Sequence, residues 1–301
     1  MTDKRKTCLI CGSDDNKSVY PKFWESLYYS CNACGHQWEL QSDYRDQGEF
    51  YFEDESYFYF SPLSQWISSC VARQRIDMVK RYLKTGLLLE IGPGTGEVIL
   101  AAEEEGFDVV AAENSKVFVN YLRSKTKASI YHGPFEDADF GKTKFDGILS
   151  FHVLEHLLNP TSHLQRTFEV TKPGGYLFLA TPNASSWDRR LCQNRWTGYS
   201  MGHVNLFSIS SIKHCLERAG WKIVGIYTIE FPFELLWSVK VMIKPKEITP
   251  QSAGSNVKRI PLQLGRIILT LFGALTKPIR FVQERLGGGN EIFVVAQRDK
   301  P

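Results

Sequence analysis

One glycine-rich segment, LLLEIGPGTGEVILAA from Leu87 to Ala102, constrains the fold more than any other part of the chain. An apolar run typical of a buried strand is followed by Gly92, Gly94 and Gly96, and then by a run typical of a helix. A strand that turns into a helix through closely spaced glycines brings its backbone close to a ligand. The segment therefore predicts a ligand-binding turn at the edge of a sheet.

The rest of the chain continues the alternation of strand and helix signals. A helix is expected over residues 62–85, with Pro62 in its first turn and Gly86 at its end. Beyond it, strand-like runs separated by helical segments indicate a mostly parallel sheet with helices on both faces. The predicted strands are 87–91, 108–112, 129–132, 145–150, 175–181, 222–229 and 291–297.

Length and composition fit such a fold. A chain of 301 residues, 43% hydrophobic and 23% charged, can form about two domains, or one large α/β domain with an appendage. The N-terminus lacks the apolar stretch of a secretory signal, and no apolar run is long enough to span a membrane. We therefore expect a cytoplasmic location. The formal net charge of +3 is too small to indicate nucleic-acid binding.

Four of the seven cysteines form two C-x-x-C pairs near the N-terminus, Cys8 with Cys11 and Cys31 with Cys34. This spacing is typical of a zinc ribbon, and a glycine after each pair allows the tight turn that a tetrahedral thiolate site needs. In a reducing cytosol such pairs favour metal over a disulfide. Four thiolates leave no open coordination position, so we expect a structural Zn²⁺ ion, with His36 as a substitute ligand.

The ligand of the glycine-rich turn is not expected to be a pyrophosphate. A dinucleotide fingerprint requires a glycine where this chain has Glu97, and a P-loop requires a lysine that is missing. Glu90, just before the turn, would repel phosphate, so a cationic or zwitterionic ligand fits better. Glu113, at the end of the next predicted strand, is placed to accept both hydroxyls of a ribose. These features together indicate S-adenosylmethionine (SAM).

EIGPGTG, together with this glutamate, resembles motif I and its partner in the class I SAM-dependent methyltransferases. The resemblance continues in order along residues 87–230 through GPFEDADF, FDGILSFHVLEHLLNP, TKPGGYLFLATPN and LERAGWKIV. Within that superfamily, the order of parts is similar to ubiquinone-biosynthesis O-methyltransferases. With the ribbon in front, it is also similar to bacterial sugar and natural-product methyltransferases.

The resemblance implies a fold and a division of the chain. We expect a Rossmann-like α/β domain with a seven-stranded sheet and helices on both faces. A zinc ribbon would occupy residues 1–41, a linker and the first helix residues 42–85, and the methyltransferase domain residues 86–301. Within that domain, residues 231–288 would form a helical insert before the last strand.

The resemblance also implies roles in holding SAM. The turn glycines would approach its methionine half, Glu90 would lie near its ammonium group, and Glu113 would hold the ribose. Phe135 and Glu136 would face the adenine, with core packing as an equal alternative for Phe135. The implied cofactor-binding set is Glu90, Gly92, Gly94, Gly96, Glu113, Asn114, Phe135, Glu136, Ser150 and His152.

Methyl transfer from a sulfonium has a good leaving group, so the protein must mainly align the acceptor and remove its proton. For a hydroxyl acceptor, a histidine is the expected base at neutral pH. His203, in a loop rich in aromatic residues and glycines, is the first candidate, His152 the second, and Tyr199 a lesser one. Asp137 and Asp139 lack a third carboxylate partner, so we expect metal-independent transfer.

The acceptor is expected to be a small-molecule, sugar or lipid-linked hydroxyl. One alternative is methylation of a sugar carbon, where the same base would abstract a C–H proton. An alternative of a different class is an RNA-binding or RNA-modifying protein, or a catalytically inactive scaffold. The near-zero formal charge of residues 1–41 and the lack of an N-P-P-Y-like run argue against nucleic acid.

The insert at residues 231–288 is long for a compact domain, which usually indicates a function. Its central run predicts a helix with a narrow basic stripe and a broad apolar face, which Pro278 should end or kink. This pattern suits peripheral contact of residues 259–285 with an anionic inner-membrane surface, and packing as a lid or in a homodimer is an equally open alternative. The stripe comprises Arg259, Arg266, Thr270 and Lys277, and the apolar face Leu264, Ile267, Ile268, Leu271, Phe272 and Leu275.

Overall fold

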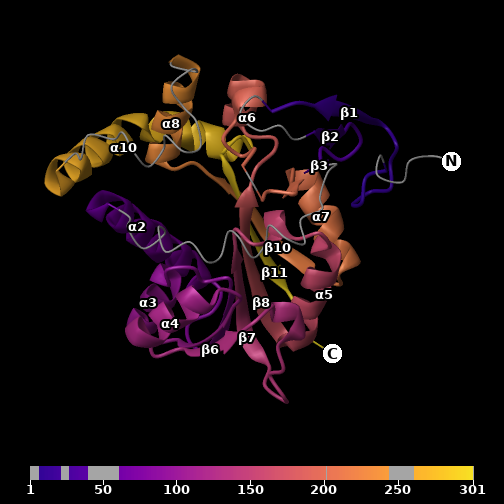
Figure 1. Ribbon diagram of the computed structural model, residues 1–301, viewed down its shortest axis with the longest axis vertical. Helices are drawn as coiled ribbons and strands as arrows, with labels where there is room; N and C mark the ends of the chain where they lie inside the picture. The colour runs from indigo at the N-terminus through magenta and orange to yellow at the C-terminus, as the bar shows by residue number, and fades with distance from the viewer. Residues whose placement is uncertain (1–6, 22–26, 40–60, 201, 244–260, 301) are drawn as a thin grey trace.

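The computed structural model describes residues 7–21, 27–39, 61–200, 202–243 and 261–300 (Figure 1). Its larger sheet has seven strands in the order β10-β11-β8-β7-β4-β5-β6, of which β4 to β8 run parallel and β11 is antiparallel to both neighbours. The predicted Rossmann-like α/β fold is confirmed. The strands are β4 (Leu87–Ile91), β5 (Asp108–Glu113), β6 (Ser129–His132), β7 (Phe145–Phe151), β8 (Thr171–Pro182), β10 (Lys222–Ile229) and β11 (Glu291–Gln297).

Helices cover both faces of this sheet, with α2, α3 and α4 on one side and α5 and α7 on the other (Figure 1). The central strands are therefore largely apolar: Leu88 packs into the core under the first group, whereas Leu89 and Ile91 pack into the core under the second. The helices are α2 (Pro62–Val79), α3 (Glu97–Glu104), α4 (Lys116–Lys125), α5 (Pro160–Val170) and α7 (Ile209–Arg218).

Helix α2 ends earlier than its predicted limit at residue 85. Its start is as expected, since Ser61 accepts a hydrogen bond from the Ser64 backbone N–H and Pro62 occupies the first turn. After Val79 the chain turns, because Tyr82 folds back to pack its ring against Phe178 on the sheet. Aromatic burial on the sheet thus outweighs continuation of the helix.

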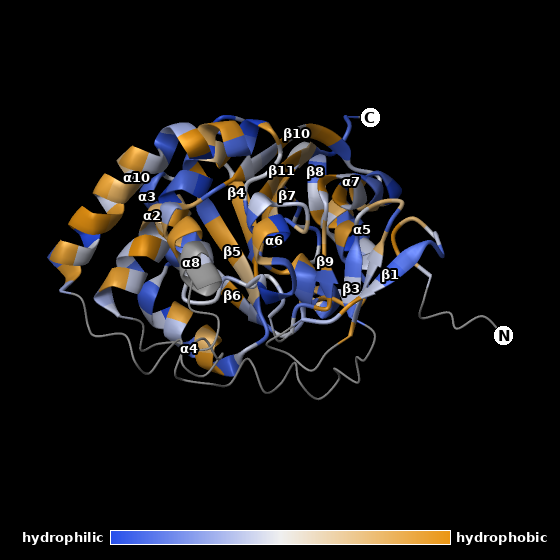
Figure 2. Cartoon of the chain, turned by 90° about the horizontal axis from the view of Figure 1, so that it is seen from above, coloured by the Kyte–Doolittle hydropathy of each residue, from blue (hydrophilic) through white to orange (hydrophobic). Residues whose placement is uncertain are grey.

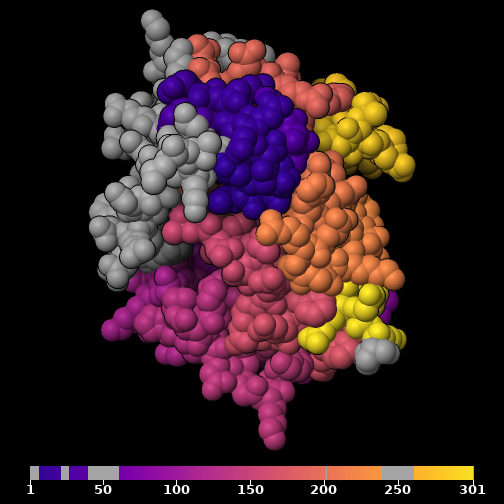
Figure 3. All heavy atoms as spheres, turned by 90° about the vertical axis from the view of Figure 1, so that its right-hand side faces the viewer, coloured from indigo at the N-terminus to yellow at the C-terminus, as the bar shows by residue number. Residues whose placement is uncertain are grey.

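The cysteine-rich segment forms a smaller sheet in the order β1-β2-β3-β9. Three strands, β1 (Asn16–Val19), β2 (Tyr28–Cys31) and β3 (Gln37–Glu39), belong to the ribbon, but β9 (Asn205–Leu206) comes from the segment after β8. Ribbon residues share one hydrophobic core with α7, against which the ribbon rests in Figure 3. The ribbon is therefore a docked module, and the linker expected from residue 42 falls largely outside the described residues.

The predicted insert contains α8 (Pro232–Ile243) and α10 (Leu262–Arg285), and α10 projects from the body above α2 (Figure 1). Helix α10 continues through Pro278, so of the two expected effects of this proline, an end of the helix or a kink, the first does not occur. The Arg280 guanidinium donates to the Gly273 carbonyl and the Thr276 hydroxyl, which adds side-chain bonds across this part of the helix. Residue 259 and the side chain of Trp237 lie outside the described part of the structure.

Among the described helices, none is both long and apolar enough to cross a membrane.

The short helix α6 (Trp187–Cys192) and β9 occupy the segment between β8 and α7. The helix predicted to begin near Ser208 does so through a capping box, in which Ser208 and Ser211 exchange side-chain-to-backbone hydrogen bonds. This cap fixes the end of the loop that carries His203.

Candidate active site

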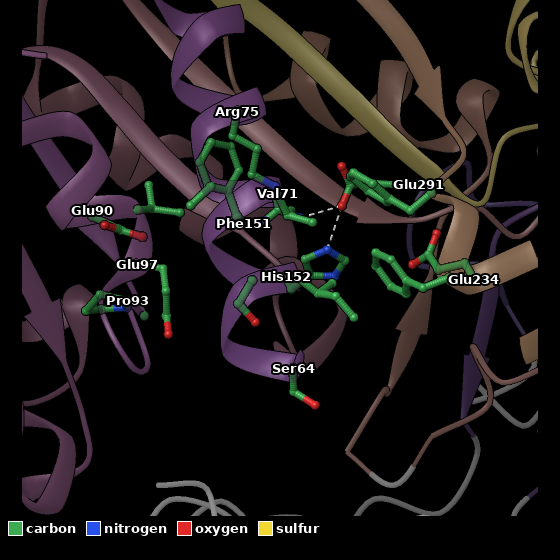
Figure 4. Close-up of a pocket in the computed structure, with 17 residues that line it drawn as sticks. Ser64, Val71, Arg75, Glu90, Pro93, Glu97, Phe151, His152, Glu234 and Glu291 are labelled. Carbon is green, nitrogen blue, oxygen red and sulfur yellow. Dashed lines mark hydrogen bonds and ion pairs between the residues drawn. The ribbon is translucent and has the colours of Figure 1, made fainter. Parts of the chain in front are cut away.

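A cavity of about 450 Å³ opens at the carboxyl ends of β4 and β7 (Figure 4). One wall is the glycine-rich turn, with Glu90, Gly92 and Glu97, and a second is α2. The opposite wall comes from the segment after β10, including Phe231 and Glu234, and from the start of β11. Parallel α/β folds hold ligands at the carboxyl edge of the sheet, where the glycine-rich turn lies. Across the same cavity, this edge faces the aromatic and acidic side chains of Phe231, Glu234 and Glu291.

The glycine-rich turn has the features that the SAM methionine group requires. Glu90 is 4% exposed, and its Oε2 has no hydrogen-bond partner. Burial raises the pKa of Glu90 to about 8. Gly94 has a positive φ of +55° and open space where a Cβ would stand. A buried carboxylate without a partner beside open backbone fits the ammonium group of SAM.

Glu113 occupies the predicted ribose position at the end of β5. Its two carboxylate oxygens accept from the backbone N–H of Ser115 at 2.8 Å and of Gly94 at 3.3 Å. These bonds hold the carboxylate beside the turn, although burial is the larger effect and raises the pKa of Glu113. The position fits a group that accepts hydrogen bonds from ribose hydroxyls.

The other predicted cofactor residues lie in different surroundings. Phe135 is 3% exposed and packs edge-on against His163, which matches the core-packing alternative. Glu136 accepts from His163 Nδ1 at 2.7 Å, Asn114 is exposed, and the Ser150 hydroxyl is buried without a partner. Contact of these side chains with adenine or the sulfonium stays a prediction.

His152 is the centre of an ion-pair network on the cavity wall (Figure 4). It directly follows β7 with a φ of 56°, which is rare for a residue with a Cβ. Its Nδ1 donates to Glu155 Oε1 at 3.0 Å and its Nε2 to Glu291 Oε2 at 2.7 Å. Arg75 Nη2, from α2, donates to the same Glu291 oxygen at 2.5 Å.

This network determines the protonation of His152. Burial opposes the charged form, but hydrogen bonds to Glu155 and Glu291 outweigh it and raise the pKa of His152 to about 10. The same contacts overcome burial at Glu155 and lower its pKa to about 2. His152 is therefore an imidazolium at neutral pH that donates both protons to carboxylates, so it has no lone pair with which to accept a proton.

Glu234 is a second carboxylate of the cavity that sequence reasoning missed, as it missed Glu291 and Arg75. Its Oε2 is buried without a hydrogen-bond partner. Burial, followed by the negative charge of Glu291, raises the pKa of Glu234 to about 7. A group that titrates near neutrality on a cavity wall has the properties of a general acid or base. A charged residue opening the apolar strand EIFVVAQ was the available signal for Glu291.

The structure does not bring His203 and Tyr199 to this cavity. His203 Nδ1 donates to the Gly198 carbonyl at 2.9 Å, and burial lowers the pKa of His203 to about 4. Tyr199 is 2% exposed and donates its hydroxyl to Gln37 of the ribbon at 2.7 Å. Neither residue lines the cavity around His152, and these positions disfavour the predicted role of either as the base.

The four ribbon cysteines form a compact cluster of thiols. Cys8 Sγ lies 3.7 Å from Cys34 Sγ, Cys11 Sγ lies 3.5 Å from Cys31 Sγ, and all four sulfurs lie within 4.8 Å of one another. Tetrahedral Zn–S bonds of about 2.3 Å place sulfurs about 3.8 Å apart, so the cluster fits zinc. His36 Nδ1 lies 3.8 Å from Cys8 Sγ, beside a set of four thiols that is already complete.

Comparison with known proteins places this fold and site in a class. A family model described as a methyltransferase domain matches residues 67–226, which is more than half of the chain. The chain therefore belongs to the class I SAM-dependent methyltransferase family. A SAM-dependent methyltransferase from Archaeoglobus fulgidus has the same fold, with a TM-score of 0.52 at 18% identity over 76% of this chain and 94% of that chain.

Curated relatives match this chain over only part of their own lengths. The cypemycin N-terminal methyltransferase of a Streptomyces species is 25% identical over 56% of this chain and 66% of its own. A ubiquinone biosynthesis O-methyltransferase of Maricaulis maris is 30% identical over 33% of this chain and 41% of its own. The chain spans about half the length of the curated relatives it matches, for example 52% of another methyltransferase relative.

Proposed function

We propose that this protein transfers the methyl group of SAM to a hydroxyl acceptor held in the cavity. SAM, when bound, supplies a methyl carbon on a positively charged sulfur. The observation that carries the proposal is that a single cavity is lined by both the glycine-rich turn with Glu90 and the acid–base cluster of His152, Glu234 and Glu291. The methyl group of SAM and the acceptor hydroxyl would then lie in the same cavity, with no protein wall between them.

Within this cavity, Glu234 is the best-matched base. Its pKa of about 7 leaves a useful fraction of carboxylate at neutral pH, and its unpaired Oε2 is able to accept the acceptor's proton. His152 would position rather than deprotonate, because both of its nitrogens donate to carboxylates. Arg75 would keep Glu291 ionised and in place. This assignment moves the base from the histidines expected from sequence to a carboxylate.

The acceptor class rests on the cavity wall. Phe151, Phe231 and Phe233 supply apolar rings, and the carboxylates supply the polar end. Such a wall suits a small-molecule, sugar or lipid-linked hydroxyl, and the ubiquinone biosynthesis O-methyltransferase relatives are consistent with oxygen as the target. Methylation of a sugar carbon remains the second candidate, because Glu234 is equally placed to take a C–H proton.

Two measurements test the proposal. Calorimetry should show SAM binding by the wild type and weaker binding by Glu113→Gln, with exposed Glu104→Gln as the matched control. A screen for labelled methyl transfer across phenols and sugar nucleotides should then find an acceptor whose turnover falls in Glu234→Gln. The position of the label in the product separates oxygen from carbon. A wild-type protein that binds no SAM would overturn the proposal.

We also propose that the ribbon cysteines hold one structural Zn²⁺. The sulfur spacing supports this, as do the left-handed glycines Gly12 and Gly35 (φ of +75° and +74°), whose backbone N–H groups bond the carbonyls of Cys8 and Cys31. Metal analysis of protein purified without chelator should find one zinc per chain bound to these thiols. Absence of zinc from such protein would contradict the assignment.

A membrane surface is the partner that we propose for α10. Its buried residues are Gly265, Gly273, Thr276 and Gln283, whereas its large apolar residues are exposed. Figure 2 shows hydrophobic residues along the length of α10. Exposed fractions reach 65% at Leu271 and 79% at Leu275. Apolar residues exposed to this degree in one row need an external partner, and packing as a lid would have buried them.

The basic stripe contributes less than the sequence suggested. Arg266 of the stripe stacks on the Trp66 ring at 5.2 Å, and Arg280, which lies beyond the stripe, donates to the carbonyls of Glu230 and Gly273. Apolar insertion should therefore dominate, with modest dependence on lipid charge.

Liposome flotation tests the membrane proposal. The wild type should float with both neutral and anionic vesicles, and the Leu271→Glu/Leu275→Glu double variant should not. Leu158→Glu, a matched change at a residue 53% exposed elsewhere, should float like the wild type. Failure of the wild type to float, with concentration-dependent dimers abolished by the double variant, would instead assign the face to a second copy.

A further inference from the structure

A second group of potential metal ligands lies behind His152, outside the cavity lining. Glu155, His156 and His203 each place one ligand atom within 4.8 Å of the others. Glu155 and His156 belong to the single turn η4 (Leu154–His156) after β7, whereas His203 comes from the loop before β9. We call these three residues the rear cluster.

The two imidazoles of the rear cluster have fixed orientations. His156 Nδ1 lies 2.9 Å from the Gly202 carbonyl oxygen, and His203 Nδ1 lies 2.9 Å from the Gly198 carbonyl oxygen. A carbonyl only accepts, so each Nδ1 carries the hydrogen and each Nε2 keeps its lone pair. Histidines that bind metals are usually held in this way, with the other ring nitrogen donating to a backbone carbonyl.

The carboxylate of the rear cluster is also fixed. Glu155 is fully buried, with Oε1 accepting from His152 Nδ1 at 3.0 Å and Oε2 from the Thr181 hydroxyl at 3.0 Å. A carboxylate has about four lone-pair positions, so both oxygens can accept one hydrogen bond and still bind a cation. His156 is exposed, which gives an ion a path from solvent.

We propose that Glu155, His156 and His203 bind one divalent transition-metal ion, of the kind of Mn²⁺, Fe²⁺ or Zn²⁺. Two imidazoles and one carboxylate favour these ions over Mg²⁺, which prefers oxygen ligands and water. Metal–ligand bonds of about 2.0–2.2 Å allow ligand atoms at most about 4.4 Å apart. The present separations therefore need to close by only a few tenths of an ångström.

Three protein donors leave coordination positions open, unlike the four thiolates of the ribbon. Glu155 connects the rear cluster to the cavity through His152, so an ion bound there would sit one residue away from the acceptor site. This inference goes beyond the proposed function, because metal binding can be measured without methyl transfer. It also revises the expectation of metal independence, which considered only Asp137 and Asp139.

The test uses full-length protein with its ribbon metal in place. Mn²⁺ is titrated in, and the free ion is counted by electron paramagnetic resonance. The wild type should bind one Mn²⁺ per chain, which excess Zn²⁺ displaces. His156→Ala and His203→Ala should each weaken binding at least about tenfold. His214→Ala, a matched change at an exposed histidine of α7, should leave binding unchanged.

Two further measurements keep the test decisive. Because His203→Ala removes a hydrogen bond that shapes its loop, His156→Ala with an unchanged circular dichroism spectrum is the deciding variant. Co²⁺ at the rear cluster should show weak visible bands without the strong thiolate charge-transfer band of a four-cysteine site. A wild type that binds no Mn²⁺ in the stoichiometric range, or His156→Ala that binds like the wild type, would overturn the proposal.

Discussion

Binding of SAM should release a proton from Glu90, the buried carboxylate beside the glycine-rich turn. Burial raises the pKa of Glu90 to about 8, so about nine-tenths of the free protein carries a neutral Glu90 at pH 7. The ammonium of the cofactor favours the carboxylate, and ionising the group at pH 7 costs about 1.4 kcal/mol of binding free energy. That cost should appear as a pH-dependent affinity.

The size of the effect follows from this pKa. Affinity should rise about ninefold from pH 6 to pH 7, because each step of one unit below the pKa costs about 1.4 kcal/mol. Calorimetry at pH 6.5 in buffers of different ionisation enthalpy should show close to one proton released from Glu90 per SAM bound. In Glu90→Gln, this proton should be missing and the affinity should be nearly constant between pH 6 and pH 7.

The comparison between wild type and variant isolates Glu90 from the cofactor's own titration. The SAM ammonium, with a pKa near 8, contributes equally to both proteins. Glu104→Gln, at an exposed glutamate of α3, is the control for removing one negative charge. Equal proton release by wild type and Glu90→Gln would refute the placement of the cofactor's ammonium beside this carboxylate.

Three further predictions concern the rest of the site and the ribbon. Turnover should rise with pH through an apparent pKa near 7 as Glu234 ionises, and Glu234→Gln should remove this rise and lower turnover about 10²–10⁴-fold in a pH–rate profile. Arg75→Met should lower the free energy of unfolding in denaturant titrations by up to about 3–5 kcal/mol, because buried Glu291 keeps only His152 as a cationic partner. Cys31→Ser should abolish zinc binding at the ribbon and lower the Tm by several degrees in scanning calorimetry, with little change in SAM affinity.

The sheet and the cofactor turn were predictable because their signals are local. The central strands are buried on both faces and are therefore largely apolar, and each is bounded by residues that end a strand. The glycines of the turn adopt positive φ, which is the backbone property that their spacing suggested. Ser208 begins a helix where its side chain caps the first turn.

The acid–base cluster was not predictable, because its members meet only when the sheet closes. Arg75 and Glu291 are separated by 216 positions along the chain, and His152 and Glu291 by 139. No local pattern connects residues so far apart, and Glu234 lies in a helix with no recognisable motif. The same reason explains why His203 was assigned to the cavity, although docking of the ribbon through β9 carries it to the rear cluster.

The insert unites the two surfaces on which the proposed function depends. Its first helix supplies Glu234 to the cavity, the strand β11 that follows it supplies Glu291, and its long helix presents apolar side chains outward. A buried network joins these parts, since Gln283 of α10 donates to the Glu230 carboxylate at 2.8 Å and Arg280 donates to the Glu230 carbonyl at 2.9 Å. Glu230 lies just before the segment that forms the cavity wall. A membrane that binds α10 would therefore also lie close to the cavity wall formed by Phe231 and Glu234. This connection favours an acceptor that reaches the cavity from the membrane surface.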